Sequence, residues 1–103
     1  MTELRWAPQA AEDLEAIRAF IGRDSVAYAR AVVERLFLAA QQLKAFPDSG
    51  RAVPERASPD IRELVRPPYR IVYRRRPDLV EILTIHHAAR PIPLDVETGG
   101  GTA

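Results

Sequence analysis

The stretch from Arg62 to Arg90 reads RELVRPPYRIVYRRRPDLVEILTIHHAAR, and the rest of the chain is organised around it. Runs rich in branched and aromatic residues are separated by Pro67-Pro68 and by the turn Arg76-Pro77-Asp78. Short proline breaks between such runs are typical of neighbouring antiparallel strands. The stretch therefore predicts a meander of three strands, at Ile61–Arg66, Tyr69–Arg74 and Leu79–His87.

The middle strand of this meander alternates clearly in side-chain character. Successive side chains on a strand point to opposite faces of the sheet. One face should therefore carry Tyr69, Ile71 and Tyr73, and the other Arg70, Val72 and Arg74. We expect the first face to cover a hydrophobic core. The second face should carry its guanidinium groups toward solvent or a partner.

The part of the chain before this stretch predicts a short strand and two helices. Residues 2–6 alternate between polar and apolar side chains, as in a strand. From Pro8 to Ile21 the apolar residues recur at intervals of three and four, which is the helical spacing. A second helix with the same spacing should begin after a cap at Asp24 or Ser25 and run to about Ala45 or Phe46. Because few residues join the two helices, an antiparallel hairpin is expected.

Length and composition are those of one small globular domain. The chain has 103 residues, of which 47% are hydrophobic and 28% charged, and its formal net charge is +1. We expect a single domain over residues 1–94 and a polar, glycine-rich flexible tail over 95–103. With no cysteine and no apolar membrane-spanning run, a cytoplasmic protein without membrane contact is expected. Any nucleic-acid role must depend on a local basic patch.

These elements predict an α+β fold of order β-α-α-β-β-β. An N-terminal strand is followed by an antiparallel helix hairpin, which packs on a mainly antiparallel sheet. The proline-rich connection over residues 53–60 is expected to be ordered but irregular.

The order of these elements, and several short motifs within them, resemble the RelE/ParE superfamily of toxins from bacterial type II toxin–antitoxin modules. The motifs come in the superfamily's order over about residues 4–90. They are Ala11 to Ile17, Phe46 to Arg51 with Val53-Pro54-Glu55, Ile61 to Leu64, Tyr69 to Arg74, Glu81 to Leu83, and His87-Ala88-Ala89-Arg90.

The resemblance implies a toxin held silent by a cognate antitoxin, whose C-terminal segment wraps over the toxin's helices and sheet. The antitoxin is expected to be of the ribbon-helix-helix type, so that operator DNA is contacted only through it. ParE-like members arrest growth by poisoning DNA gyrase and are not known as enzymes. RelE-like members are endoribonucleases that cut messenger RNA on the ribosome. A third alternative is a non-toxic member that only binds its antitoxin and regulates its operon.

Each alternative assigns different roles to the same residues. In the ParE-like alternative the target-binding residues are Arg62, Arg70, Arg74, His87 and Arg90, and none is catalytic. In the RelE-like alternative Arg62, Arg70, His87 and Arg90 would serve as phosphate and acid–base groups of a metal-independent ribonuclease. Antitoxin binding is expected at Leu14, Ile17, Ile21 and Tyr73, and no cofactor is expected.

Two departures from the RelE-like pattern favour the ParE-like alternative. The connection from Ala52 to Ile61 contains no lysine, although the ribonuclease pattern places lysines there. No tyrosine follows the last predicted strand, so the C-terminal tyrosine of that pattern has no counterpart. The ending His87-Ala88-Ala89-Arg90 resembles the histidine-small-small-arginine ending of ParE-like sequences.

Purely structural roles compete with these functional ones. Arg70 could pair with Glu63 or Glu81 across the sheet. Tyr69 and Tyr73 fit a core better than a nucleotide-stacking platform. His86 and His87 are adjacent on a strand and face opposite sides, so no metal site is expected from them.

Overall fold

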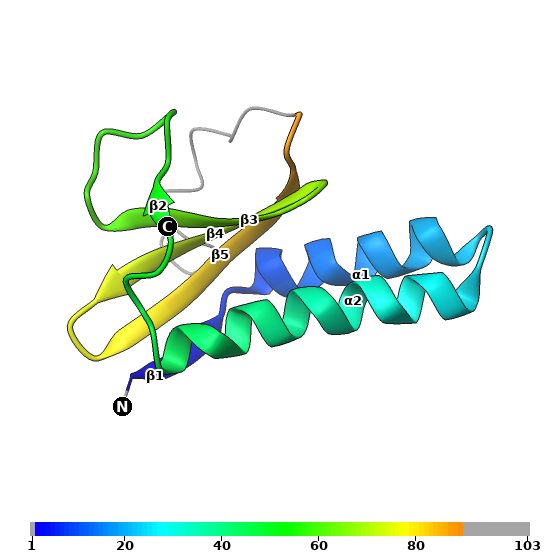
Figure 1. Cartoon of the computed structure of the whole chain (residues 1–103), viewed down its shortest axis with the longest axis horizontal. Helices are drawn as coiled ribbons and strands as arrows, with labels where there is room; N and C mark the ends of the chain where they lie inside the picture. Colours follow the sequence, from blue (N-terminus) through cyan, green and yellow to red (C-terminus); the bar gives the residue numbers. More distant parts are fainter. Residues whose placement is uncertain (1, 90–103) are drawn as a thin grey trace.

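The computed structural model describes residues 2–89, which form two helices, a short 3₁₀ turn and one sheet. In chain order the elements are β1 (Glu3–Trp6), α1 (Pro8–Gly22), α2 (Val26–Gln41), η1 (Gln42–Lys44), β2 (Arg51–Ala52), β3 (Ile61–Arg66), β4 (Tyr69–Arg76) and β5 (Leu79–His87). The sheet has the strand order β1-β5-β4-β3-β2. The two helices lie side by side on one face of it, and the connection after β2 lies on the opposite side (Figure 1).

The predicted α+β fold is confirmed by this arrangement. β1 pairs in parallel with β5, and the other neighbouring strands pair antiparallel. Three details differ from the prediction. β4 runs to Arg76, two residues further than predicted. The α-helical part of the second helix ends at Gln41 and continues as the 3₁₀ turn η1, and the two-residue strand β2 was not predicted. Arg90 and the predicted tail 95–103 lie outside the described residues, as does the predicted domain boundary at residue 94.

The helix hairpin begins and ends where its sequence directs. Pro8 opens α1 at a position where a missing N–H costs no hydrogen bond. The Ser25 side chain caps α2 by accepting a hydrogen bond from the Tyr28 N–H at 3.1 Å. At the other end of the hairpin, the Trp6 ring of β1 stacks on Phe37 of α2 with centroids 6.0 Å apart. The hairpin is thereby fastened to the edge strand of the sheet.

The main core lies between the hairpin and the sheet. α2 supplies Val32, Leu36, Ala39 and Ala40 to it, whereas α1 buries fully only Ala10. The sheet supplies Leu64, Ile71, Tyr73, Val80, Ile82 and Ile85. Leu14, Ile17 and Ile21 of α1 pack against this core and stay partly exposed.

The second face of the sheet is also covered, which corrects the prediction that this face of β4 points to solvent. Val72 is fully buried there in a smaller cluster with Val53, Ile61 and Leu83. Arg70 is only 6% exposed on the same face. The reason is the connection between β2 and β3, which folds back over this face and buries Val53 against it.

β5 has a β-bulge, and a carboxylate from α1 accepts hydrogen bonds from the residues that follow it. The register between β4 and β5 shifts so that Val72 lies opposite Thr84 and Tyr73 opposite Ile82, which leaves Leu83 unpaired as a β-bulge. Beyond Ile82, β1 no longer covers this edge of β5. Asp13 takes over there, because it accepts hydrogen bonds from the Thr84 hydroxyl and from the Ile85 N–H, the latter at 3.1 Å. A backbone donor that would be left open on the sheet edge is thus satisfied by a helix side chain.

Tyr73 connects the core to the segment between η1 and β2. Its ring is fully buried, and its hydroxyl donates to the Pro47 carbonyl at 2.8 Å and accepts from the Gly50 N–H at 3.0 Å. Arg62 donates to the Gly50 carbonyl at 3.0 Å. A Cβ atom at Gly50 would lie 2.6 Å from the Tyr73 hydroxyl and 2.7 Å from the Glu63 carbonyl oxygen. Only glycine fits at this position without moving the β3 backbone.

Gly50→Ala should therefore lower the free energy of unfolding by about 2–3 kcal/mol, through overpacking and through disturbance of the Tyr73 hydrogen bonds. Urea unfolding followed by circular dichroism measures this change. Gly22→Ala is the matched control, because a Cβ atom there would meet only the Ala29 Cβ at 3.9 Å. Equal stabilities of the two variants would show that the Tyr73–Gly50 contact is not tight.

Stability should also fall at alkaline pH because of Tyr73. Burial raises the pKa of the Tyr73 phenol above its ordinary value of 10.0. The unfolded chain loses this proton first, so Tyr73 has no effect on the pH dependence below about pH 10, and stability falls as pH rises toward the folded-state pKa. The slope should be smaller in Tyr73→Phe, which at neutral pH should cost about 1–3 kcal/mol by leaving the Gly50 N–H and Pro47 carbonyl without their partner. Urea unfolding across this pH range compares the two proteins, and parallel curves would contradict the assignment.

Candidate functional site

A network of buried charges occupies the sheet face opposite the helices, which we call the far face. Arg70 of β4 donates from Nε to Glu63 at 2.6 Å, and its two terminal nitrogens donate to the two Glu55 carboxylate oxygens at 2.9 and 2.7 Å. Arg51 of β2 binds the other Glu63 oxygen at 2.8 Å. The Glu63 side chain is fully buried and that of Arg70 is 8% exposed. The network joins β2, β3 and β4 to the connection that covers the far face.

This network corrects the role predicted for Arg70. The structural alternative with Glu63 as partner is confirmed, whereas Glu81 instead lies 4.0 Å from Arg74. The hydrogen bonds to Glu55, and then those to Glu63, raise the pKa of the Arg70 guanidinium above its ordinary value despite burial. Arg70 is thus held by two carboxylates below the covering connection, and only 8% of its side chain is exposed.

The other predicted target-binding residues lie apart from one another. Arg62 lies opposite Tyr73 in the register, so it shares the helix-facing side of the sheet, whereas Arg74 lies on the far face next to Glu81. His87 is opposite Tyr69 on the helix-facing side. Because four residues of β4 separate Tyr73 from Tyr69, Arg62 and His87 are about 13 Å apart along the strands. Arg90 lies outside the described residues.

The structure therefore does not bring Arg62, Arg70 and His87 together into one reacting centre. A ribonuclease needs its acid, base and phosphate groups around one phosphodiester. A binding role tolerates this separation, because contacts with a large partner are spread over a surface.

Three of the four residues predicted to bind the antitoxin keep some exposed surface. Leu14, Ile17 and Ile21 follow one another along α1, partly buried at the margin of the core. Tyr73 is the exception, and its prediction as an antitoxin contact is corrected by its complete burial and its bonds to Pro47 and Gly50. It is a residue of the core.

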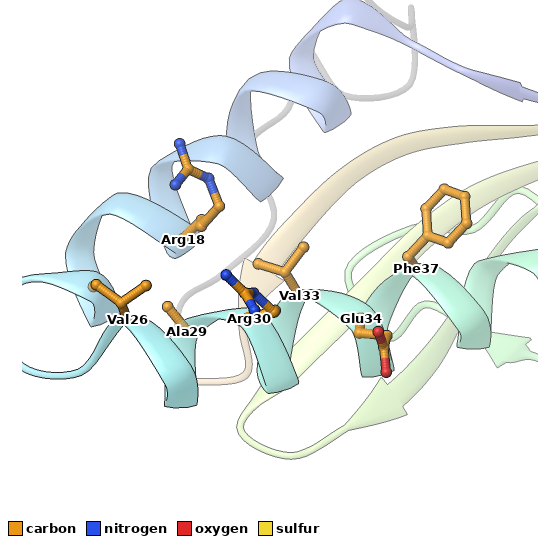
Figure 2. Close-up of a pocket in the computed structure, with 8 residues that line it drawn as sticks. Arg18, Val26, Ala29, Arg30, Val33, Glu34 and Phe37 are labelled. Carbon is orange, nitrogen blue, oxygen red and sulfur yellow. The ribbon is translucent and has the colours of Figure 1, made fainter.

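The outer side of the helix hairpin carries a groove of about 370 Å³, which we call the hairpin groove. Its lining is Arg18, Gly22, Val26, Ala29, Arg30, Val33, Glu34 and Phe37. Figure 2 shows Arg18 projecting from α1, while the other labelled side chains come from α2. Val26 and Phe37 are exposed, at 67% and 42%. Apolar walls with two arginines at the rim suit an amphipathic segment that carries acidic side chains.

A second groove, of about 350 Å³, lies between α1 and the end of β5, and we call it the α1–β5 groove. Its lining is Asp13, Ala16, Ile17, Phe20, Tyr69, Ile85, His86 and His87. Ile17 thus lies where one wall of this groove meets the core. His87 is exposed at its end, with its ring edge against Tyr69 at 5.9 Å between centroids and its Nδ1 accepting from the Ala89 N–H.

Sequence reasoning missed the partners of two carboxylates that organise these surfaces. In the sequence, Asp13 and Glu55 stand only inside motifs shared with the superfamily. Their partners are far away in the chain, with Asp13 bonded to Thr84 and Ile85, and Glu55 to Arg70. Glu63 was already named as a possible partner of Arg70, because the two residues lie on neighbouring predicted strands.

Within residues 2–89 no group of three or more histidine or acidic side chains is placed to hold a metal ion. Over the same residues, neither helix is long and apolar enough to cross a bilayer.

Comparison with known proteins gives one consistent result. Residues 4–92 match the family model of the ParE toxin of the type II toxin–antitoxin system parDE. Toxin RelE2 of Caulobacter vibrioides is 42% identical over 91 residues, which cover 87% of this chain and 99% of that protein. The chain also superposes on a chain of the chromosomal ParDE system of P. aeruginosa with a TM-score of 0.68 and 26% identity, covering 84% of this chain and 96% of that one. The toxin–antitoxin complex RelBE2 of Mycobacterium tuberculosis gives a TM-score of 0.57 at 26% identity, with the same coverage.

The far-face network predicts a large effect of a small substitution. Glu63→Gln keeps the side-chain shape but removes a buried charge that two arginines share, and this should lower the free energy of unfolding by about 3 kcal/mol or more. Thermal or urea unfolding measures the change. Glu15→Gln is the matched control, because Glu15 pairs with Arg18 on an exposed helix surface, where no measurable change is expected. Equal effects of the two substitutions would mean that the network does not stabilise the fold.

Proposed function

Because the chain belongs to the ParE toxin family of type II toxin–antitoxin systems, we propose that it arrests bacterial growth by poisoning DNA gyrase and is neutralised by a cognate antitoxin. The observation that carries this proposal is the ParE family match, which extends over nearly the whole described chain. The scattered positions of Arg62, Arg70 and His87 support a surface that binds a target over one that catalyses a reaction.

The exposed helix hairpin supports an antitoxin as partner. Phe20, Val26 and Leu38 are each more than half exposed, although side chains of this size are usually covered. The hairpin groove adds apolar walls between Arg18 and Arg30. We infer that an amphipathic antitoxin segment with acidic side chains covers the hairpin, and that it continues from a ribbon-helix-helix domain which contacts operator DNA.

The runner-up is a ribosome-dependent endoribonuclease. The observation in its favour is the 42% identity to a protein named Toxin RelE2. In this alternative the groups at the cleaved phosphodiester would include Arg62, His87 and Arg90, and their convergence would need the ribosome or the messenger RNA. A third alternative is a non-toxic member that only binds its antitoxin.

A gyrase assay separates these alternatives. Purified protein added to gyrase, relaxed plasmid and ATP should block supercoiling and accumulate linear DNA from trapped cleavage complexes. His87→Ala should raise the concentration for half-inhibition by about tenfold, which is the loss of about 1.4 kcal/mol of binding. Because His87 is exposed and its only side-chain hydrogen bond in the described chain is a local one to Ala89, this variant should keep its stability.

Tyr28→Ala is a suitable control, because Tyr28 is an exposed residue near the start of α2 that no assigned surface uses. Unaffected gyrase, with cleavage of messenger RNA on ribosomes that Arg90→Ala abolishes, would replace the proposal by the runner-up. Normal growth on expression without antitoxin would favour the non-toxic alternative.

A further inference from the structure

Three side chains form a row across β3, β4 and β5 at one end of the sheet, on its helix-facing side. Arg66 is opposite Tyr69 in the register of β3 and β4, and Tyr69 is opposite His87 in the register of β4 and β5. Directly opposed residues on neighbouring strands share a face, so the three side chains form a line with Tyr69 in the middle. Because strands are about 4.8 Å apart, the line is about 10 Å long between the backbones of Arg66 and His87.

A fourth side chain joins this row from the hairpin. Arg35 of α2 donates to the Pro67 carbonyl at 3.0 Å, in the turn that directly follows Arg66. Arg66 itself donates to the Val65 carbonyl at 3.0 Å. A guanidinium has five N–H donors, so each arginine is positioned by one of them and keeps others for a ligand. We call Arg35, Arg66, Tyr69 and His87 the turn cluster.

Arg35 and Arg66 of the turn cluster differ in charge balance from the arginines that form ion pairs across the sheet. Arg51, Arg70, Arg74 and Arg75 each have a carboxylate oxygen within 4.0 Å. In the described chain neither Arg35 nor Arg66 has such a partner. Asp13 in the adjoining α1–β5 groove is bonded to Thr84 and Ile85. Glu55, which lines a hollow with Val65 and Ala88, is bonded to Arg70. Within residues 2–89, the cluster therefore carries positive charge with no carboxylate paired to it.

We propose that the turn cluster binds the phosphodiester backbone of DNA. The inference rests on the proposed function, because a gyrase poison meets its target with DNA bound to it. Guanidinium groups match two oxygens of one phosphate. Arg35 and Arg66 can each contact one phosphate of a DNA strand, so two phosphate contacts are expected. Tyr69 lies between the cations as a surface that a sugar or base can contact.

An acidic protein segment is the competing ligand, and the surroundings favour it less. The exposed neighbours of the cluster are Pro67, Pro68, Ala88 and Ala89. These side chains offer no pocket beside Arg66 for the large aromatic or aliphatic anchors that dominate protein–protein affinity. Such anchors fit the hairpin groove and the α1–β5 groove instead.

Fluorescence anisotropy with a labelled duplex of about 20 base pairs tests the proposal directly on the full chain, without gyrase. Arg35→Gln combined with Arg66→Gln should weaken DNA binding by at least about tenfold near 0.1 M salt, and should reduce the slope of log K against log salt by about 2, since each lost phosphate contact contributes roughly 0.9. The matched control is Arg5→Gln with Arg76→Gln. This pair removes the same charge from exposed arginines toward the opposite end of the sheet.

Equal losses in the two double variants would overturn the proposal, because net charge alone would then explain the binding. No DNA binding by the wild-type chain, or tighter binding of a poly-glutamate peptide than of the duplex, would also overturn it. If the Gln pair unfolds, Arg35→Lys with Arg66→Lys keeps both charges and should retain the salt slope. A lowered slope in that folded variant would count against phosphate contacts.

The results distinguish a failure of the proposed DNA site from a failure of the proposed function. Gyrase inhibition by the wild type, together with unchanged DNA affinity of the Gln pair, removes the turn cluster and leaves the proposed function intact. DNA affinity lost in the Gln pair, with gyrase unaffected by the wild type, removes gyrase as the target and leaves the DNA site.

Discussion

β4 is buried from both sides, and the rest of the structure follows from the need to cover it. Ile71 and Tyr73 on the helix-facing side and Val72 on the far face are fully buried, and Arg70 is nearly so. The helix hairpin covers only one face of the sheet. The connection after β2 must therefore cover the other face, and it does so with one apolar side chain, Val53, and one carboxylate, Glu55. Burying Arg70 requires that carboxylate, because a guanidinium without a partner in the interior would cost several kcal/mol.

The small number of layers also explains why the helix hairpin has exposed apolar surface. α1 covers the edge of the sheet, where Asp13 satisfies the Ile85 N–H, and it buries only Ala10 completely. Its remaining apolar side chains and those of the outer side of α2 have no further layer of this chain above them in the described residues. A protein that functions in a pair can leave such a surface for its partner, because the partner's segment completes the layer on binding.

The periodicity of apolar residues predicted the helices and the longer strands. Segments without a period, and contacts between residues far apart in the chain, were not predicted. Alternation in β4 correctly separated Tyr73 from Arg70, but alternation reports only that two faces exist and not what covers each of them. The covering connection has no period, and β2 has two residues, so neither leaves a pattern. The separation of Arg62 from Arg70 could have been derived, because the two-residue turn Pro67-Pro68 places Arg66 opposite Tyr69 and hence Arg62 opposite Tyr73. The carboxylate partners Asp13 and Glu55 could not, since pairs 15 to 72 residues apart need the fold itself.

The basic residues of this chain are nearly all arginine, so residue type alone does not show which of them stabilise the fold and which can bind a ligand. Arg70 and Arg51 are neutralised by Glu63 and Glu55 and hold the far face together. Arg35 and Arg66 each donate to a backbone carbonyl, and no carboxylate among residues 2–89 forms an ion pair with them. A guanidinium suits both roles, because its five donors can be divided between the fold and a ligand, whereas a lysine presents one compact charge. The two groups of arginines differ in whether a carboxylate is paired with them. The positions of the acidic residues are therefore needed, together with those of the arginines, to assign a role to each arginine.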